Sequence, residues 1–400
     1  MQAYSHVTSP VLVLGATGLI GREVVRQLLA AGRPMLAMAR TRDGRSATDR
    51  VIRAVGPAEA AAGPLEVVEG DLALPACGLS EMECRRLQGS VETVIHCAGE
   101  TAFFPGAMTP FRAAHLGGPR WLLETLRGGR LRTWAHVSTA YVCGCRSGVV
   151  LEREAEVGQR FHNPYERVKL EAEQVMREAG ARLGVDVRIF RPSLVVGMPS
   201  GTLGGSASAL FFDFIRLLAM LARNDRGSKV CLRIEGAPRA AFNIVPVEYV
   251  AAALAALADH PEGAGETFHL VVSNPPTQES VLATITDRLG LHGVRVVDAR
   301  EGPLASPTGL ERKVARLLVG YRDYLVQDVR FDDTSARRLL DACGLPVPRL
   351  SPAVLHELID QALQGDGGGP AHGGDRTKGD PVGAGLACMI PGSIRTDGRG

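Results

Sequence analysis

A tyrosine and a lysine stand four residues apart in the segment HNPYERVKLEAEQ, which covers residues 162–174. Asn163 is a preferred helix N-cap, and Pro164 suits the first helical position because its fixed φ is already helical. A helix that begins here places Tyr165 and Lys169 on the same face. A free phenol titrates at about pH 10, and a neighbouring positive charge favours its ionised form. The pair is therefore a candidate for proton transfer, although by itself it also suits a half-exposed tyrosine beside a surface lysine.

The residues that follow indicate a helix with one buried face, because apolar side chains recur at helical spacing. The positions expected to pack inward are Val168, Ala172, Val175, Met176 and Ala179. The positions expected to face water are Glu171, Glu173 and Arg177.

Three glycines lie where an apolar strand is expected to turn into a helix. The segment VLVLGATGLIG contains Gly15, Gly18 and Gly21 and leads into the amphipathic segment LIGREVVRQLLAAG. Glycine lets the backbone approach a pyrophosphate closely, and a helix N-terminus supplies N–H donors. A glycine triplet alone is a weak signal, but this strand-to-helix context predicts a dinucleotide-binding loop.

An arginine stands where a NAD-selective site usually carries an acidic residue. The second expected strand, PMLAMAR, ends at Arg40, and Arg42 and Arg45 follow. An Asp or Glu would accept a hydrogen bond from the ribose 2′-OH, whereas guanidinium groups suit a 2′-phosphate. We therefore expect NADPH (NADP) as the cofactor, with solvent-facing arginines as the alternative.

Short apolar strands alternate with amphipathic helices from Val11 onward, which predicts an α/β fold with a doubly wound parallel sheet of the Rossmann type. After Gly197 the alternation stops, and we expect a smaller substrate lobe that is interleaved with the sheet in sequence. The segment FNIVP is expected to return to the main sheet, and ETFHLVVSNPPT to build the smaller lobe. The expected domain covers residues 1–365, with the Rossmann core at about 10–197 and 243–260 and the substrate lobe at about 198–242 and 261–365. Residues 366–400 are rich in glycine and charge, so we expect a disordered tail.

The composition argues against several other classes of protein. The chain has 400 residues and a formal charge of +2, with no block of Lys and Arg interleaved with aromatics, so nucleic acid is not an expected partner. The eight cysteines lack zinc-site spacing, so no metal site is expected and reduced thiols in a cytoplasm fit best. The first residues lack a signal-peptide pattern. The longest apolar run has 14 residues and is interrupted by Asp213 and Arg216, so no transmembrane segment is expected.

Taken together, these motifs resemble the short-chain dehydrogenase/reductase superfamily in its extended form, over about residues 10–360. GATGLIG resembles the cofactor loop, GDL the adenine contact, HCAG the turn beside the nicotinamide ribose, and RPSLVVG the loop that closes over the nicotinamide. In HVSTAYVCG, Thr139 falls on the catalytic serine/threonine position, and Tyr165 and Lys169 match the Tyr-x-x-x-Lys pair. The resemblance implies that these three residues are catalytic. The cofactor contacts that it implies are Gly15, Thr17, Gly18, Leu19, Ile20, Gly21, Arg40, Asp71, Leu72, Cys97, Ala98, Gly99, Tyr165, Lys169, Pro192 and Ser193.

One position departs from the family pattern. Related sequences usually read Asn-Val-x-Gly-Thr where this chain has HLGGP, so His115 stands at the asparagine position. A proton-relay histidine and a simple packing replacement are the two alternatives.

Within the superfamily, the segments ARTRDG, GDLALPACGLSEMECRRL, HVSTAYVCG and SNPPT are most similar to the thioester reductase and fatty acyl-CoA reductase branch, the male-sterility type. The resemblance implies an NADPH-dependent reduction of an acyl thioester, on CoA or on a carrier protein, to an aldehyde or an alcohol. An apolar helix with Phe211, Phe212 and Phe214 would then line an acyl groove. The oligomeric state is left open, a dimer being one alternative.

Other functions in the superfamily stay open. A ketone or hydroxysteroid-type dehydrogenase needs only the same three catalytic residues, and a nucleotide-sugar epimerase is a further alternative. Sugar dehydratases usually have an Asp-Glu pair after the catalytic threonine, where this chain has Ala140 and Tyr141. A redox-sensing scaffold would bind the cofactor without turnover, and the intact Thr, Tyr and Lys argue against it.

Overall fold

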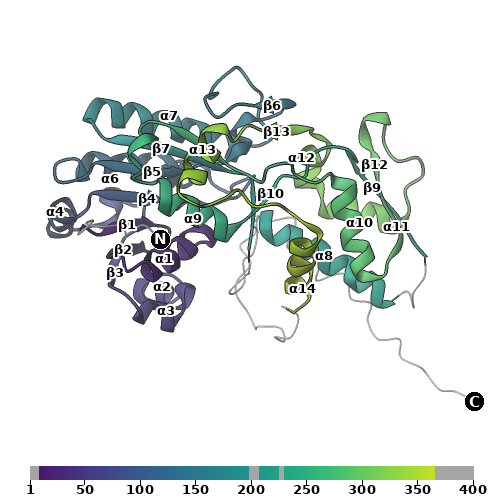
Figure 1. Cartoon of the computed structure of the whole chain (residues 1–400), viewed down its shortest axis with the longest axis horizontal. Helices are drawn as coiled ribbons and strands as arrows, with labels where there is room; N and C mark the ends of the chain where they lie inside the picture. Colours follow the sequence, from purple (N-terminus) through teal and green to yellow (C-terminus); the bar gives the residue numbers. More distant parts are fainter. Residues whose placement is uncertain (1–8, 198–206, 225–228, 365–400) are drawn as a thin grey trace, which may run out of the picture.

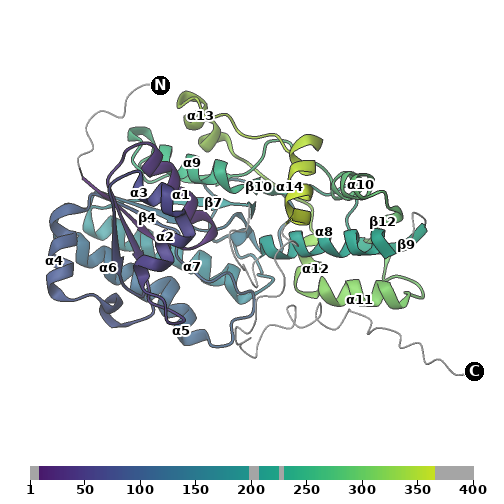
Figure 2. The ribbon, with the colours of Figure 1, turned by 90° about the horizontal axis from the view of Figure 1, so that it is seen from below.

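The computed structural model describes residues 9–197, 207–224 and 229–364 (Figure 1). The tail expected at 366–400 therefore lies outside the described residues. A large sheet covered by helices forms one side of the molecule, and a smaller helical lobe forms the other (Figures 1 and 2).

A seven-stranded parallel sheet forms the centre of the larger part, with the strand order β3-β2-β1-β4-β5-β7-β11. The strands are β1 (Val11–Leu14), β2 (Met35–Ala39), β3 (Leu65–Glu69), β4 (Thr93–His96), β5 (Thr133–Val137), β7 (Asp186–Pro192) and β11 (Thr267–Leu270). The order runs one way from β1 to β3 and the other way from β4 to β11. This arrangement confirms the expected doubly wound sheet, whose ligands bind where the strand order reverses.

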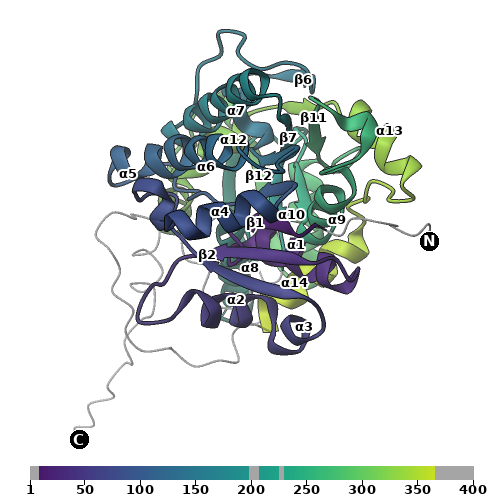
Figure 3. The same cartoon turned by 90° about the vertical axis from the view of Figure 1, so that its left-hand side faces the viewer.

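Alternate side chains of each strand enter two separate cores, as the pleat requires. Val11 and Val13 pack with α1 (Leu19–Ala30), α2 (Ala47–Val55), α9 (Val247–Leu257) and α13 (Thr334–Ala342). Leu12 and Leu14 pack with α4 (Glu81–Ser90), α6 (Gly118–Leu126) and α7 (Pro164–Leu183). Figure 3 shows α4, α6 and α7 on one side of the sheet and α1 and α2 on the other.

The smaller lobe has its own apolar core. Two parallel strands, β9 (Lys229–Gly236) and β12 (His292–Asp298), pack with α8 (Ala207–Asn224), α10 (Gln278–Leu289), α11 (Gly309–Leu317) and α14 (Pro352–Gln364). The apolar helix expected around Phe211 is α8, in which Phe212 and Ile215 are buried. A short helix, α12 (Arg322–Val326), lies on the side of this lobe that faces the sheet (Figure 1).

The structure divides the chain differently from the sequence pattern in two places. The segment FNIVP forms β10 (Ile244–Pro246), which pairs with β8 (Leu194–Val196) in a separate two-stranded sheet and does not return to the main one. The main sheet instead gains β11, which was expected in the smaller lobe, and α13 packs on the same face as α9. Both segments are short apolar runs, and their hydrophobic pattern does not say which sheet they join.

The helix predicted at the tyrosine and lysine is α7. The Asn163 side chain accepts a hydrogen bond from the Glu166 backbone N–H at 3.1 Å, and Pro164 is the first helical residue, as expected. Glu173, expected to face water, is buried and pairs with Arg191, whose two nitrogens lie 3.0 and 2.6 Å from the carboxylate oxygens. The helical pattern places Glu173 near the buried face, and a strand arginine distant in sequence supplies its partner.

Candidate active site

The segments predicted to bind the cofactor all follow parallel strands, so they meet at the carboxyl edge of the sheet. Gly15 follows β1, Arg40 follows β2, Asp71 follows β3, Cys97 follows β4 and Thr139 follows β5. Pro192 ends β7, and Ser193 donates its backbone N–H to Leu270 at 3.2 Å.

The glycine loop is packed too closely for side chains at two of its positions. A Cβ at Gly15, which has φ +81°, would lie 2.6 Å from the Ala98 backbone. A Cβ at Gly21 would lie 2.2 Å from the Gly15 carbonyl oxygen. Gly18 is the N-cap of α1 and provides no side chain to cap it, and Leu19 and Ile20 form the first turn. This bare helix N-terminus beside a backbone cradle fits a pyrophosphate group.

Arginines cluster at the adenosine end of the expected cofactor site. Arg40 is exposed, and its Nη1 lies 3.2 Å from an Asp71 carboxylate oxygen. Arg50, on α2, donates from Nη1 to the Arg40 carbonyl and places Nη2 3.5 Å from the Thr17 hydroxyl. Burial, and then repulsion by Arg40 and Arg42, lowers the pKa of Arg50. Sequence analysis missed Arg50, which stands on the next helix and not in the loop after β2.

The loop after β4 carries Cys97, Ala98 and Gly99 beside His115. Burial raises the pKa of the Cys97 thiol to about 12. The His115 ring packs against Gly99 and its Nε2 lies 3.1 Å from the Glu100 carbonyl oxygen. Burial, and then the Lys169 charge, lowers the pKa of His115 to about 3, so its ring is neutral near pH 7. A π-helical turn over Ala113–Gly117 holds this histidine between α5 (Met108–Arg112) and α6.

Lys169 joins the helix of the proposed proton donor to the strand that leads to Thr139. Its Nζ donates a hydrogen bond to the Val137 carbonyl oxygen at 2.7 Å, and its side chain is buried. Burial is the largest cause that lowers the pKa of Lys169, to about 8, and Glu173 acts in the opposite direction. Two residues after Val137, the Thr139 hydroxyl accepts a hydrogen bond from the Tyr141 backbone N–H at 3.3 Å.

Tyr165 lies beside two aromatic rings of the larger part of the molecule, and one of them also contacts the smaller lobe. Its ring centre is 6.1 Å from that of Phe103 and 6.3 Å from that of His115. Burial, and then the Glu166 charge, raises the pKa of Tyr165. The expected lowering by Lys169 is therefore not seen in this structure, and Tyr165 is a neutral phenol that can donate its proton. Sequence analysis missed Phe103, whose ring is also 5.4 Å from that of Tyr324 in α12.

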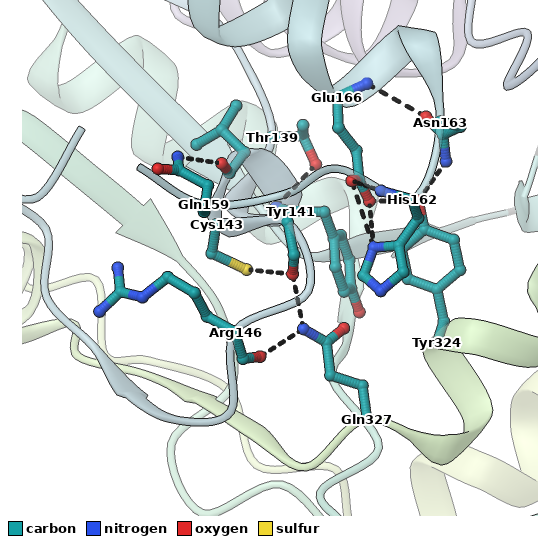
Figure 4. A network of polar contacts seen from close by, with 12 residues as sticks. Thr139, Tyr141, Cys143, Arg146, Gln159, His162, Asn163, Glu166, Tyr324 and Gln327 are labelled. Atoms are coloured by element: carbon teal, nitrogen blue, oxygen red, sulfur yellow. Dashed lines mark hydrogen bonds and ion pairs between the residues drawn. The ribbon is translucent and has the colours of Figure 1, made fainter. Parts of the chain in front are cut away.

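A buried carboxylate beside Tyr165 connects α7 to α12 (Figure 4). Glu166 accepts hydrogen bonds from the His162 backbone N–H at 2.9 Å and from the Tyr324 hydroxyl. The His162 Nδ1 lies 3.0 Å from the same carboxylate. The amide of Asn163 donates to the Tyr324 oxygen at 2.7 Å.

The fold and this site define an NAD(P)-dependent oxidoreductase of the extended short-chain dehydrogenase/reductase type. The chain belongs to the male sterility protein family, whose model matches residues 13–254.

This chain matches only a small part of the length of two curated relatives. Peramine synthetase A of Epichloe festucae (strain Fl1) is 32% identical over 204 residues, which are 48% of this chain and 7% of that protein. The L-2-aminoadipate reductase large subunit of Penicillium chrysogenum is 28% identical over 290 residues, which are 66% of this chain and 19% of that protein. Among solved structures, the terminal R domain from the myxalamid PKS-NRPS biosynthetic pathway has a TM-score of 0.67 at 21% identity, covering 90% of this chain and 91% of that one.

The described residues contain neither a candidate membrane span nor a candidate metal cluster. No helix among them is both long enough and apolar enough for a membrane crossing. No group of three or more His, Cys, Asp and Glu side chains within the described ranges is placed to hold a metal ion.

Proposed function

We propose that this chain is an NADPH-dependent reductase of an acyl thioester carried on CoA or on a carrier protein. The observation that carries the proposal is the hydrogen bond from Lys169 to Val137, which holds the Tyr165 helix against the strand that leads to Thr139. The name of the L-2-aminoadipate reductase large subunit supports reduction of a carboxyl-derived group.

The cofactor would be held by residues that the structure brings to one edge. Gly15, Gly18 and Gly21 would accept the pyrophosphate, and Arg40 and Arg50 the 2′-phosphate. Asp71 and Leu72 would lie beside the adenine, whereas Cys97, Ala98, Gly99, Pro192 and Ser193 would surround the nicotinamide half. When bound, the nicotinamide supplies a hydride.

The chain's own residues would handle the substrate oxygen. The Thr139 hydroxyl would donate a hydrogen bond to the thioester carbonyl oxygen. Tyr165 would donate its phenolic proton to the oxygen as negative charge develops there, giving a hemithioacetal. Collapse of the hemithioacetal breaks the C–S bond and releases the thiol and an aldehyde. The Lys169 ammonium would hold the ribose by a charge-assisted hydrogen bond.

Three finer points belong to the same proposal. Reduction would stop at the aldehyde or continue to the alcohol with a second hydride. The binding of substrate by the smaller lobe and the cytoplasmic location also stay predictions.

The test is a panel of acyl-CoA and acyl-carrier thioesters, with consumption of NADPH followed by absorbance and products analysed by mass spectrometry. We expect thiol release together with an aldehyde or alcohol, and loss of both in Tyr165→Phe. A ketone panel run in parallel serves as the comparison. Turnover of ketones with no turnover of any thioester would contradict the proposal and favour the ketone dehydrogenase alternative.

A further inference from the structure

An apolar cavity of about 150 Å³ is lined mostly by residues of the smaller lobe, and Tyr141, which follows β5 of the main sheet, is also in its wall. Leu194 of β8, Phe214 of α8, Ile234 of β9, and Val281 and Ile285 of α10 contribute to its wall. Phe211 also lines it, whereas Phe212 is only 2% exposed and packs in the core. The expected acyl groove therefore involves two of the three phenylalanines named from the sequence.

Aromatic contacts connect this cavity to Tyr165. Tyr141, Tyr321 and Tyr324 line the cavity. The Phe103 ring centre lies 5.0 Å from that of Tyr321, 5.4 Å from that of Tyr324 and 6.1 Å from that of Tyr165. Figure 1 shows α12, which carries Tyr324, nearer the sheet, and α10 farther from it. Val281 and Ile285 belong to the α10 wall of the cavity, whereas the ring contacts that lead to Tyr165 start from Tyr321 and Tyr324.

Four polar side chains in the wall have hydrogen-bond partners in the protein, and they are Glu235, Asn243, Gln278 and Tyr324. Glu235 accepts a hydrogen bond from the Leu304 backbone N–H at 3.0 Å, and its other oxygen lies 3.6 Å from Arg322. Asn243 donates to the Val329 carbonyl oxygen at 2.9 Å.

Gln278 and Tyr324 complete this set. The Gln278 amide donates to the Leu325 carbonyl oxygen at 2.8 Å and accepts from the Ala237 backbone N–H at 3.3 Å. Tyr324 donates to Glu166. A charged group that entered the cavity would lose its hydration without gaining a free partner from these four side chains.

We propose that this cavity holds an uncharged, apolar acyl group next to the reacting carbonyl. An apolar cavity of about 150 Å³ in another protein binds benzene, so the group has about six to eight carbon atoms, as in a hexanoyl or benzoyl thioester. This inference rests on the proposed function and adds a substrate class to it.

The first measurement compares acetyl-, hexanoyl- and adipoyl-CoA as substrates of the full chain. Each buried methylene strengthens binding about fourfold, and hexanoyl has four methylenes more than acetyl. The kcat/KM for hexanoyl-CoA should therefore exceed that for acetyl-CoA by on the order of 100-fold. Adipoyl-CoA has the same chain length but ends in a carboxylate, so its kcat/KM should fall by about 100-fold or more from the hexanoyl value.

The second measurement does not depend on turnover. Calorimetry compares the binding of S-hexyl-CoA and S-methyl-CoA, two thioethers that lack a carbonyl. The hexyl compound should bind at least about tenfold more tightly, because only its chain fills the cavity.

Three variants locate the acyl group. Val281→Phe adds a ring at the α10 wall of the cavity and should reduce the advantage of hexanoyl- over acetyl-CoA to less than about tenfold. Phe214→Ala enlarges the cavity from a half-buried position and should move the best substrate toward decanoyl-CoA. Leu221→Ala is the matched control, because Leu221 is on the same helix but does not line the cavity. Thermal unfolding checks that each variant folds. If Val281→Phe does not fold, Phe214→Ala alone tests whether the acyl group occupies the cavity.

The outcomes separate this inference from the proposed function. Selective binding of the hexyl thioether without turnover of any thioester would support the cavity assignment and overturn the proposed reaction. Reduction of hexanoyl- and adipoyl-CoA at equal rates, with equal binding of the two thioethers, would overturn the cavity assignment and leave the reaction standing.

Discussion

The hydroxyl of Tyr324 donates a hydrogen bond to the carboxylate of Glu166, the residue next to the proposed proton donor. Glu166 is fully buried at the start of α7, and Tyr324 belongs to α12 in the smaller lobe. Asn163, the N-cap of α7, also donates to the Tyr324 oxygen at 2.7 Å. The first turn of the Tyr165 helix is therefore bonded directly to a wall of the apolar cavity.

Tyr324→Phe should destabilise this connection, because it leaves a buried carboxylate with one partner fewer. We expect the free energy of unfolding to fall by about 1–3 kcal/mol, measured by urea denaturation. Combined with Glu166→Gln, the two changes should cost less than their sum, since both remove the same contact. Strict additivity would show that the two side chains act independently.

Tyr165→Phe should lower kcat by about 10²–10⁴ while leaving the dissociation constant for NADPH nearly unchanged. The ring still packs against Phe103 and His115, and only the hydroxyl that supplies the proton is lost. Initial rates and fluorescence titration of the cofactor provide the two measurements. A variant with more than about half of the wild-type rate would remove Tyr165 from the role of acid.

Lys169→Met should change how stability depends on pH. Burial lowers the pKa of Lys169 in the folded state from 10.5 to about 8, so the unfolded chain binds more protons between these values. The stability that comes from this titration is fully present above pH 10.5 and is lost as the pH falls through about 8. Relative to the variant, the wild type should therefore gain on the order of 3 kcal/mol from pH 8 to 10.5. Parallel unfolding curves of the two proteins at all pH values would contradict the buried, titrating lysine.

Local patterns in the sequence predicted the features that depend on interactions between residues close in sequence. The N-cap at Asn163, the glycine loop at Gly15 and the parallel central sheet are all present. Each depends on residues close in sequence or on a regular alternation of strands and helices.

The features that sequence patterns did not predict depend on contacts between distant residues. Nothing near Glu173 indicates that Arg191 will bury it, and nothing near Phe103 shows that its ring joins Tyr165 to Tyr324. The choice between β10 and β11 as the seventh strand likewise depends on which short apolar run reaches β7.

The last prediction concerns Arg50, the arginine that the loop pattern after β2 did not include. Its guanidinium lies 3.5 Å from the Thr17 hydroxyl, and repulsion from Arg40 and Arg42 contributes to lowering its pKa. An anion between these groups would relieve that repulsion, and the 2′-phosphate is the anion that distinguishes NADPH from NADH.

Charge-assisted hydrogen bonds contribute about 1.5–3 kcal/mol, so Arg50→Ala should weaken NADPH binding roughly ten- to a hundredfold. Binding of NADH should hardly change. Arg40→Asp should reduce or reverse the preference as well, whereas Arg53→Ala is the matched control, because Arg53 is exposed on the same helix as Arg50. Titration of both reduced cofactors against the wild type and the three variants decides the matter. A 2′-phosphate site must distinguish the two cofactors. If the wild type bound NADH as tightly as NADPH, these arginines would be solvent-facing residues that do not contact the cofactor.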